Sequence, residues 1–307
     1  MNRLLQFLVV GLALQQAQAQ NWLTNGLVAY YPFNGNPNDE SGNGHHGQIA
    51  GNVVSAPDRF GNTARAYRFV HETYGSINVS SPVLNLGQTE YTVAGWFCTD
   101  EVTKLYQNII NTIPHPGFML ELNNEVVPGC VELSTGSGSA WTDTYLAGVK
   151  TNFTNQFWYQ LVLTKSGSNY AVYINGQIDG QHAVSAAATY NCNVGYRFGA
   201  INTGTWNWQG FHGRLDDFRI YNRALSASEV AQLYTIEYPP TVNLVKACTV
   251  DFSNLIIGCG YQAQVSSDLT NWTNWGDPFT ATSFTYTNTN YDRIEGWNQR
   301  FFRLLLQ

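Results

Sequence analysis

A loop rich in carboxylate and amide oxygens is the first stretch of this chain whose residue types could do chemistry. Residues 34–47 read NGNPNDESGNGHHG, and the interleaved glycines let the backbone curve tightly. Such oxygens are the ligands of a hard cation such as Ca²⁺. The alternative is an Asn/Gly turn cluster held by its own side-chain hydrogen bonds. His45 and His46 close the loop, but adjacent histidines here are expected to be solvated, and calcium disfavours nitrogen ligands.

Aromatic side chains in two later loops could stack on a sugar ring. Trp141 and Tyr145 follow the stretch GSGSA, and Trp206 and Trp208 lie in NTGTWNWQG. These four residues are the candidate ligand-binding residues of the chain. The alternative is that each ring plugs its loop onto the body of the fold.

The chain has five cysteines, and none has the C-x-x-C spacing of a zinc or redox site. Cys248 and Cys259 flank a short turn, so they are predicted to face each other across a hairpin and form a disulfide. Cys98, Cys130 and Cys192 cannot all pair with one another. At least one of these three is therefore expected to be a buried, inert thiol.

Composition restricts the classes of partner. Charged residues make up only 12 % of the 307 residues, aromatic residues 14 %, and the formal net charge is −6. No basic run is present, which argues against nucleic acid and anionic membranes as partners. An uncharged polar surface with many Trp and Tyr residues suits contacts with sugars or with other proteins.

The N-terminus is typical of a secretory signal peptide. Arg3 precedes an apolar run over residues 4–14, and residues 17–19 read AQA, an A-x-A-like cleavage site. The run is too short to span a bilayer, although a retained signal anchor is the alternative. The mature product, from Gln20 onward, is therefore expected to be exported, either secreted or held at the cell surface, with no membrane insertion.

The elements that must position these residues are mostly strands. Short runs rich in β-branched and aromatic residues at even spacing predict an antiparallel β-sandwich or jelly roll. Residues 91–98 and 157–165 are the strongest runs, and Asn175-Gly176 is a preferred hairpin turn. A helix is expected at residues 226–234, with Ser226 as N-cap and Glu229 completing a capping box.

Four parts are predicted along the chain. Residues 1–19 form the signal peptide and residues 20–236 the larger domain. Residues 237–241 contain two prolines and form a linker. Residues 242–307 then carry four strand-like runs, the last of them apolar, and form a small C-terminal β domain.

Several separated motifs, in the right order, resemble one known family. They are LVAYYPF at 27–33, DESGNG at 39–44, TVAGWF at 92–97, VYING at 172–176 and GRLDDFRIYNRALS at 213–226. Together they resemble the LamG-like jelly-roll domains of the concanavalin A-like lectin/glucanase superfamily, over about residues 20–235. Residues 261–272 resemble a short β-module found behind such domains in secreted bacterial proteins.

The resemblance implies that the first and last strands of the domain are antiparallel neighbours. Asp39 and Asp216 would then meet, and family members often carry calcium at this place. Counting by two from Phe218 turns Asp216 inward, where calcium, backbone amides or Arg214 would have to balance its charge. The expected calcium ligands are Asp39, Asp216, Asn34, Asn36 and Asn43, with Asp217 in reserve.

The resemblance leaves open whether the chain is an enzyme, because the fold hosts glucanases and lyases as well as lectins. The E-x-D-x-E strand of the glucanase branch is missing, and Glu121 and Glu125 are four residues apart, the wrong spacing for one strand. Lyase and G-x-S-x-G patterns are missing too. The chain is therefore expected to be a non-catalytic carbohydrate-binding module with a structural calcium. A structural or adhesive protein that binds cell-surface or extracellular proteins is the alternative.

Overall fold

A computed structural model of the protein divides into two compact units. The larger unit ends at Val230, and the C-terminal unit comprises Ala231–Gln307 with the turn Asn175–Gln177. The division falls inside a helix, before the predicted linker, and the predicted domain limits stay predictions. The structure describes residues 22–70, 75–80, 90–112, 117–125, 128–136, 144–183, 195–200, 209–245, 249–288 and 300–307.

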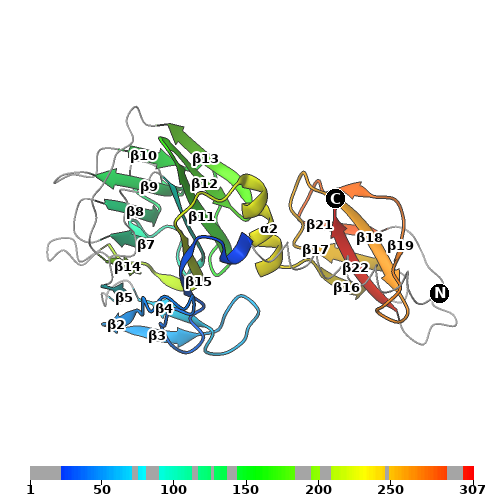
Figure 1. Ribbon diagram of the computed structural model, residues 1–307, viewed down its shortest axis with the longest axis horizontal. Helices are drawn as coiled ribbons and strands as arrows, with labels where there is room; N and C mark the ends of the chain where they lie inside the picture. Colours follow the sequence, from blue (N-terminus) through cyan, green and yellow to red (C-terminus); the bar gives the residue numbers. More distant parts are fainter. Residues whose placement is uncertain are drawn as a thin grey trace. The chain divides into compact units, whose positions relative to one another are not determined.

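The larger unit is a sandwich of two antiparallel sheets, which confirms the predicted all-β jelly-roll class (Figure 1). Sheet A contains, in spatial order, β13 (Gln177–Ala183), β12 (Asn169–Ile174), β11 (Tyr159–Ser166), β6 (Glu90–Thr99), β15 (Gly213–Tyr221), β4 (Ala66–Phe69) and β3 (Val53–Ala56), with β1 (Leu27–Tyr31) also on β15. Sheet B contains β10 (Thr144–Ala147), β9 (Val131–Gly136), β8 (Gly117–Leu122), β7 (Gln107–Thr112), β14 (Tyr196–Phe198), β5 (Ser76–Val79) and β2 (Gln48–Ala50).

An apolar core fills the space between the sheets, because alternate residues of each strand point inward. Aromatic rings make its centre. Phe33, Phe198 and Phe218 lie with ring centroids 4.8–6.4 Å apart, and all three are buried. Tyr31 joins them, and its hydroxyl donates to the carbonyl oxygen of His45 at 2.6 Å. The polar end of this tyrosine therefore ties the loop after β1 to the core.

The first strand pairs with the last strand of the sandwich, as predicted. β1 runs antiparallel to β15, with Leu27 opposite Tyr221 and Tyr31 opposite Phe218. β15 pairs on its other side with β6, and its first residues pair with β4. One strand thus connects the N-terminal segment with the middle of the domain.

A β-bulge in β15 changes which face its side chains occupy. The register with β6 shifts between Asp216 and Arg219, and Asp217 has a φ of 50°, a left-handed conformation that Asp tolerates better than most residues. Asp216 stands opposite Trp96, outside the core, while Phe218 points into it. The prediction that these two side chains share a face is wrong, because the bulge breaks the period of two.

The helix and the hairpin turn follow the sequence signals. α2 (Ala227–Glu237) begins after Ser226, whose hydroxyl accepts from the Glu229 backbone N–H (3.3 Å), while the Glu229 carboxylate accepts from the Ser226 N–H (2.8 Å). This is the predicted capping box. Asn175 and Gly176 both have positive φ, and a methyl group on Gly176 would lie 3.0 Å from Tyr234 of the helix. Glycine is therefore required at position 176, both for the positive φ and because no side chain fits beside the helix.

The C-terminal unit contains two small sheets around its own core. Its strands are β16 (Thr241–Val245), β17 (Thr249–Ser253) and β21 (Thr285–Asn288) in one sheet, and β19 (Thr273–Asn274), β18 (Gly260–Ser266), β20 (Phe279–Thr280) and β22 (Phe301–Leu306) in the other. Cys259 is a free thiol, so the predicted disulfide with Cys248 is not found, although Cys248 itself lies outside the described residues. Cys98 and Cys130 are also free and buried, as expected of inert thiols.

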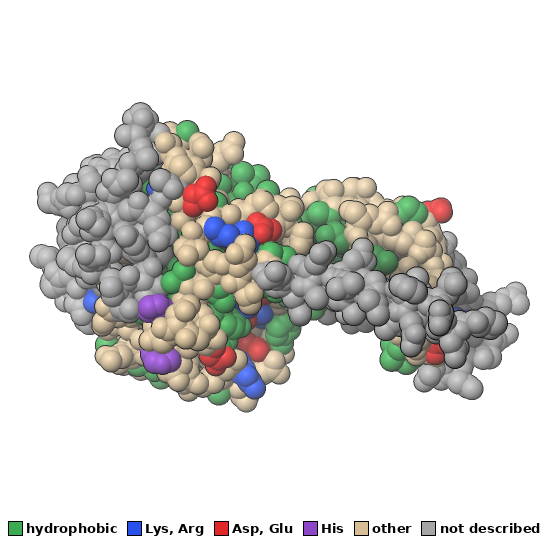
Figure 2. Space-filling view, in the orientation of Figure 1, with side chains coloured by type: hydrophobic (Ala, Val, Ile, Leu, Met, Phe, Trp, Pro, Cys, Tyr) green, Lys and Arg blue, Asp and Glu red, His purple; other side chains and the backbone are tan. Residues whose placement is uncertain are grey.

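The surface carries few charges. In the face shown in Figure 2, acidic and basic side chains are few among the described residues. Within the described ranges, no helix is long and apolar enough to cross a membrane.

Close packing at Gly95 of β6 generates the first prediction. A methyl group there would lie 2.5 Å from a ring carbon of Phe218, which has no free space to move into. Gly95→Ala should therefore lower the free energy of unfolding by about 1–3 kcal/mol, measured by thermal denaturation. Gly260→Ala, where the added carbon would meet Gln307 at an ordinary 3.5 Å, is the control. An unchanged melting temperature for Gly95→Ala would contradict the packing described.

Candidate functional site

The oxygen-rich loop after β1 is held by hydrogen bonds centred on Asp39. Its carboxylate accepts from the backbone N–H groups of Tyr30 (2.9 Å), Ser41 (2.8 Å) and His45 (2.9 Å). Burial alone would raise the pKa of Asp39, but these bonds outweigh burial and hold the pKa below its usual value. The carboxylate therefore fixes the turn as an anion surrounded by backbone donors.

The predicted asparagine ligands have other roles. The Asn43 side-chain amide donates to the carbonyl oxygen of Val28 at 2.8 Å, which ties the loop back to β1. Asn36 accepts from the backbone N–H of Asn38 at 2.9 Å, and Asn34 is exposed. These contacts are those of a turn cluster held by its own side chains.

Asp216 and Asp217 are paired with an arginine from a distant loop. Arg59 lies 3.0 Å from the Asp216 carboxylate and 2.7 Å from that of Asp217, and its guanidinium stacks over the ring of Trp96. Burial and the neighbouring Asp217 charge raise the pKa of Asp216, and Arg59 partly offsets this. The Tyr30 hydroxyl also donates to Asp217 at 2.7 Å.

Asp39 and Asp216, the two carboxylates predicted to share a calcium ion, have separate protein partners. Backbone N–H groups surround the Asp39 carboxylate. Arg59 pairs with one oxygen of Asp216, and the other Asp216 oxygen has no hydrogen-bond partner in the described structure. Among the described residues, no group of three or more His, Cys, Asp or Glu side chains could hold a metal. The calcium stays a prediction.

The aromatic candidates cannot be placed. Trp141, Trp206 and Trp208 lie outside the described residues. Only the backbone of Tyr145 is described, and it stands opposite Ser134 where β10 pairs with β9.

A row of four polar side chains and one methionine instead crosses sheet B on the face turned away from the core. Ile77, Leu120, Leu133 and Phe198 point into the core, so their neighbours along each strand point the other way. The register aligns those neighbours across five adjacent strands. They are Ser134 of β9, Met119 of β8, Asn111 of β7, Arg197 of β14 and Asn78 of β5, and each pairs with the next.

A second, shorter row lies beside the first. Glu132 of β9 stands directly opposite Glu121 of β8, and Glu121 opposite Asn108 of β7. We call the two rows together the polar face. Glu121 and Asn108 are 0 % exposed and Glu132 is 1 % exposed, although they lie outside the core. Buried polar groups are costly unless they have partners, which distinguishes these residues from an ordinary solvated surface.

Hydrogen bonds orient the side chains of the polar face. Asn111 donates to the side-chain oxygen of Asn108 at 2.5 Å and to a backbone carbonyl oxygen at 3.0 Å. Ser134 donates to Glu132 at 2.6 Å. Arg197 donates to the side-chain oxygen of Asn78 at 2.5 Å, and burial lowers the pKa of Arg197 to about 10, so it stays charged at neutral pH.

The connection between β6 and β7, residues 100–106, fixes where β7 enters sheet B. The Gln107 side chain accepts from the Thr99 hydroxyl at 2.7 Å and donates to the carbonyl oxygen of Lys104 at 3.1 Å. The Asn123 amide donates to the same carbonyl oxygen at 2.9 Å. The start of β7 and the end of β8 are therefore held together, which keeps Asn108 beside its partner on β8.

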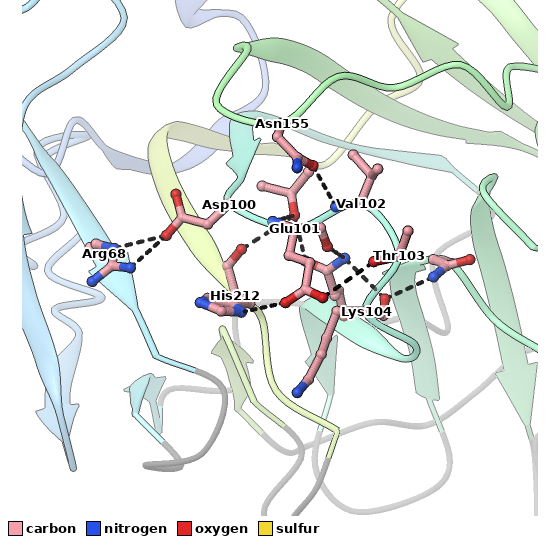
Figure 3. Close-up of polar contacts among 11 residues, drawn as sticks. Arg68, Asp100, Glu101, Val102, Thr103, Lys104, Asn155 and His212 are labelled. Carbon is pink, nitrogen blue, oxygen red and sulfur yellow. Dashed lines mark hydrogen bonds and ion pairs between the residues drawn. The ribbon is translucent and has the colours of Figure 1, made fainter.

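Further contacts anchor that connection from outside (Figure 3). Arg68 pairs with Asp100 through two nitrogens, at 2.7 and 2.9 Å, and the Asp100 N–H donates to the His212 carbonyl oxygen at 2.8 Å. Asn155 accepts from the backbone N–H of Val102 at 2.7 Å. Each of these groups has a structural partner, so we assign this cluster to positioning rather than to ligand binding.

Glu121 is the electrostatically unusual residue of the polar face. Burial raises its pKa to about 7, a hydrogen bond from Asn124 opposes the rise, and the charge of Glu132 adds to it. In the described structure, the second oxygen of Glu121 and the side-chain nitrogen of Asn108 have no hydrogen-bond partner. A buried acceptor and a buried donor therefore lie unused side by side.

Sequence reasoning missed Glu121 and Glu132 because it considered carboxylates only along one strand. A signal was present: in GFMLEL and VELS the polar residues alternate with apolar ones, which places them on one face. The pairing of β8 with β9 then brings the two glutamates together.

Comparison with known proteins agrees with this fold. Residues 71–231 match a family model described as the concanavalin A-like lectin/glucanases superfamily. No curated protein matches the chain in sequence.

Solved structures with the same fold include several binding domains. Domain 4 of AbnA, a GH43 extracellular arabinanase from Geobacillus stearothermophilus solved with arabinotriose, is 22 % identical, with a TM-score of 0.55 over 68 % of this chain and 98 % of its own. The binding domain of Paraclostridial mosquitocidal protein 1 is 17 % identical (TM-score 0.57; 78 % of this chain, 61 % of its own). The binding domain of botulinum neurotoxin DC, solved with SialylT, is 13 % identical (TM-score 0.54; 78 % and 57 %). The chain thus spans about three fifths of these toxin domains, and the likenesses establish the fold.

The role of Asp39 generates a prediction about metal dependence. Asp39→Asn removes the charge and one acceptor, so it should lower the free energy of unfolding by about 1–3 kcal/mol. The contacts described require the same loss with calcium or with chelator present, measured as melting temperature. A loss seen only in calcium, together with a chelator-sensitive wild type, would instead support the predicted metal.

Burial of Glu121 generates a prediction about pH. Because its pKa is raised to about 7 in the folded state from an ordinary 4.5, folding is favoured at low pH and that stability is lost as pH rises through 7. Glu121→Gln cannot ionise, so it should gain about 3 kcal/mol of stability relative to wild type between pH 4 and pH 9.

Denaturant unfolding across that pH range measures the difference. Glu125→Gln changes an exposed glutamate close by and should follow the wild type. If Glu121→Gln also follows the wild type, the carboxylate is not buried as described.

Proposed function

Because the chain belongs to the concanavalin A-like lectin/glucanases superfamily, we propose that its larger unit is a non-catalytic, lectin-like module that binds carbohydrate on the polar face of sheet B. The observation that carries this proposal is the alignment of amide, hydroxyl, carboxylate and guanidinium groups across adjacent strands outside the core. A few well-placed polar groups of this kind set the orientation and specificity of a bound ligand.

The ligands of similar folds support a sugar as the ligand class. The arabinanase domain was solved with arabinotriose and the neurotoxin domain with SialylT. The low content of charged residues agrees, since sugar hydroxyls are recognised by amides and single charges rather than by charged patches. Trp141, Tyr145, Trp206 and Trp208 remain proposed stacking residues.

A non-catalytic role is proposed on the arrangement of the carboxylates. The glucanase pattern of acid and nucleophile along one strand is missing, and Glu121 and Glu132 instead face each other across two strands. Glu121 accepts a hydrogen bond from Asn124, and Glu132 accepts one from Ser134.

The cellular setting proposed is extracellular. The N-terminal segment has the pattern of a signal peptide, although residues 1–19 lie outside the described structure, and the arabinanase domain belongs to an extracellular enzyme. A protein ligand is the alternative, because the neurotoxin binding domain was also solved with rat synaptotagmin II. A structural calcium ion remains a prediction from the sequence.

Direct binding tests the proposal. The mature protein should retain oligosaccharides on a glycan array, and titration calorimetry should show Arg197→Gln weakening that binding about tenfold or more, since it loses a charged donor. Arg303→Gln makes the same change in the C-terminal unit, where Arg303 stacks on Trp272, and should bind as wild type does.

Three results would count against the proposal. They are the absence of any retained glycan, equal weakening by both arginine variants, and release of shorter oligosaccharides during incubation. The last would show that the polar face cleaves its ligand.

A further inference from the structure

A pocket at the β13 edge of sheet A lies on a different sheet from the polar face. It is formed by the end of β11, the start of β12 and the end of β13, which are neighbouring strands (Figure 1). Its volume is about 390 Å³. That volume is at the small end of the range for ligand pockets, which suits one ring rather than an extended chain.

The strand register turns this pocket away from the core. Thr164 of β11 stands opposite Ala171 of β12, and both line the pocket. Leu163 and the two residues that flank Ala171 belong to the core, so the side chains of Thr164 and Ala171 point to the outer side of the sheet. Ser166 stands opposite Asn169 one step further along the same side.

The pocket is open to solvent. The residues at its rim, Ser166, Asn169, Gln181 and His182, are all exposed, while Thr164 is only 6 % exposed and lies deeper. A ligand can therefore reach the polar side chains without any rearrangement of the sheet.

The polar side chains of the rim are available to a ligand. Within the described part of the chain, the side chains of Asn169, Gln181 and His182 make no hydrogen bond or ion pair with the protein. The Ser166 hydroxyl donates to Glu90 at 3.4 Å, which leaves its oxygen free to accept. Single exposed polar side chains are ordinarily hydrated, but here they converge on one concave volume.

The chemistry of the lining selects an uncharged, hydroxyl-rich ligand. Amide, hydroxyl and imidazole groups can together donate and accept, as sugar hydroxyls also do. No Asp, Glu, Lys or Arg is among the residues that line the pocket, so a carboxylate, sulfate or ammonium group would enter without a counter-charge. Ala171 and Ala183 supply small apolar surfaces that leave room for a ring.

We propose that this pocket is a second binding site, which takes one uncharged sugar unit whose hydroxyl groups hydrogen-bond to Asn169 and Gln181. The site goes beyond the proposed function, because it lies on sheet A and holds a single unit, either a free monosaccharide or the end of a glycan.

Sugar titrations followed by NMR test the site directly. L-Arabinose, D-galactose, D-glucose and D-mannose are the free neutral probes, arabinotriose is the glycan probe, and N-acetylneuraminate is the anionic probe. At least one neutral monosaccharide should shift the backbone amide resonances of Ser166, Asn169, Gln181 and His182 in the mature chain. A shift with arabinotriose but with no free sugar would assign the pocket to the ends of glycans.

Two variants and a matched control check the assignment. Asn169→Ala and Gln181→Ala should each weaken binding at the pocket about fivefold, since each removes hydrogen bonds to the sugar. Gln177→Ala changes an exposed glutamine of the same strand that does not line the pocket, and it should bind as wild type does. Melting temperatures of all three should equal that of the wild type, because the three side chains are exposed.

Three results would overturn the second site. They are the absence of shifts at the pocket with every sugar, equal weakening by Gln181→Ala and Gln177→Ala, and tighter binding of N-acetylneuraminate than of the neutral sugars. Shifts confined to Arg197 and Asn111 would likewise overturn it while supporting the polar face. Shifts confined to the pocket would support the second site and count against the polar face.

Discussion

The pairing of β15 with three other strands is the constraint on which the rest of the larger unit depends. β15 pairs with β6 along one edge, and with β4 and β1 along the other. Its Phe218 occupies the space that Gly95 leaves open, at the centre of the aromatic core. Once that strand is placed, the ends of the domain meet and the two sheets are held at one spacing. The inner side chains of sheet B complete the same core from the opposite side.

The buried carboxylates of the polar face lower the stability of the folded state. A neutral residue in place of Glu121 would fill the same volume without placing two carboxylates side by side, and buried, partly unsatisfied groups of this kind destabilise the folded state. Local rules of folding are most often broken at functional sites. In the Arg59 cluster on sheet A, a guanidinium offsets part of the cost of burying Asp216 beside Asp217.

The sequence predicts single strands, turns and helices well, but it predicts poorly which side chains from distant elements come into contact. The Asn175-Gly176 turn, the Ser226 capping box and the pairing of the first strand with the last are signalled by residue types or by recognised motifs, and the structure contains all three. The face of Asp216 was mispredicted because no residue pattern announces a bulge at Asp217. The partner of Asp216 was missed because Arg59 lies in a turn far away in sequence. The glutamate pair depends on sheet order, which alternation within one strand does not reveal.

The register across sheet B also sets the length of the row of side chains on its outer side. Neighbouring strands lie about 4.7–4.9 Å apart, so the row from Ser134 on β9 to Asn78 on β5 extends over about 19 Å. That length exceeds a single sugar ring, so the proposed function implies a ligand of several sugar units. Under the proposed function, a substitution on one strand would change recognition of one sugar unit, while the side chains that fill the core stay unchanged.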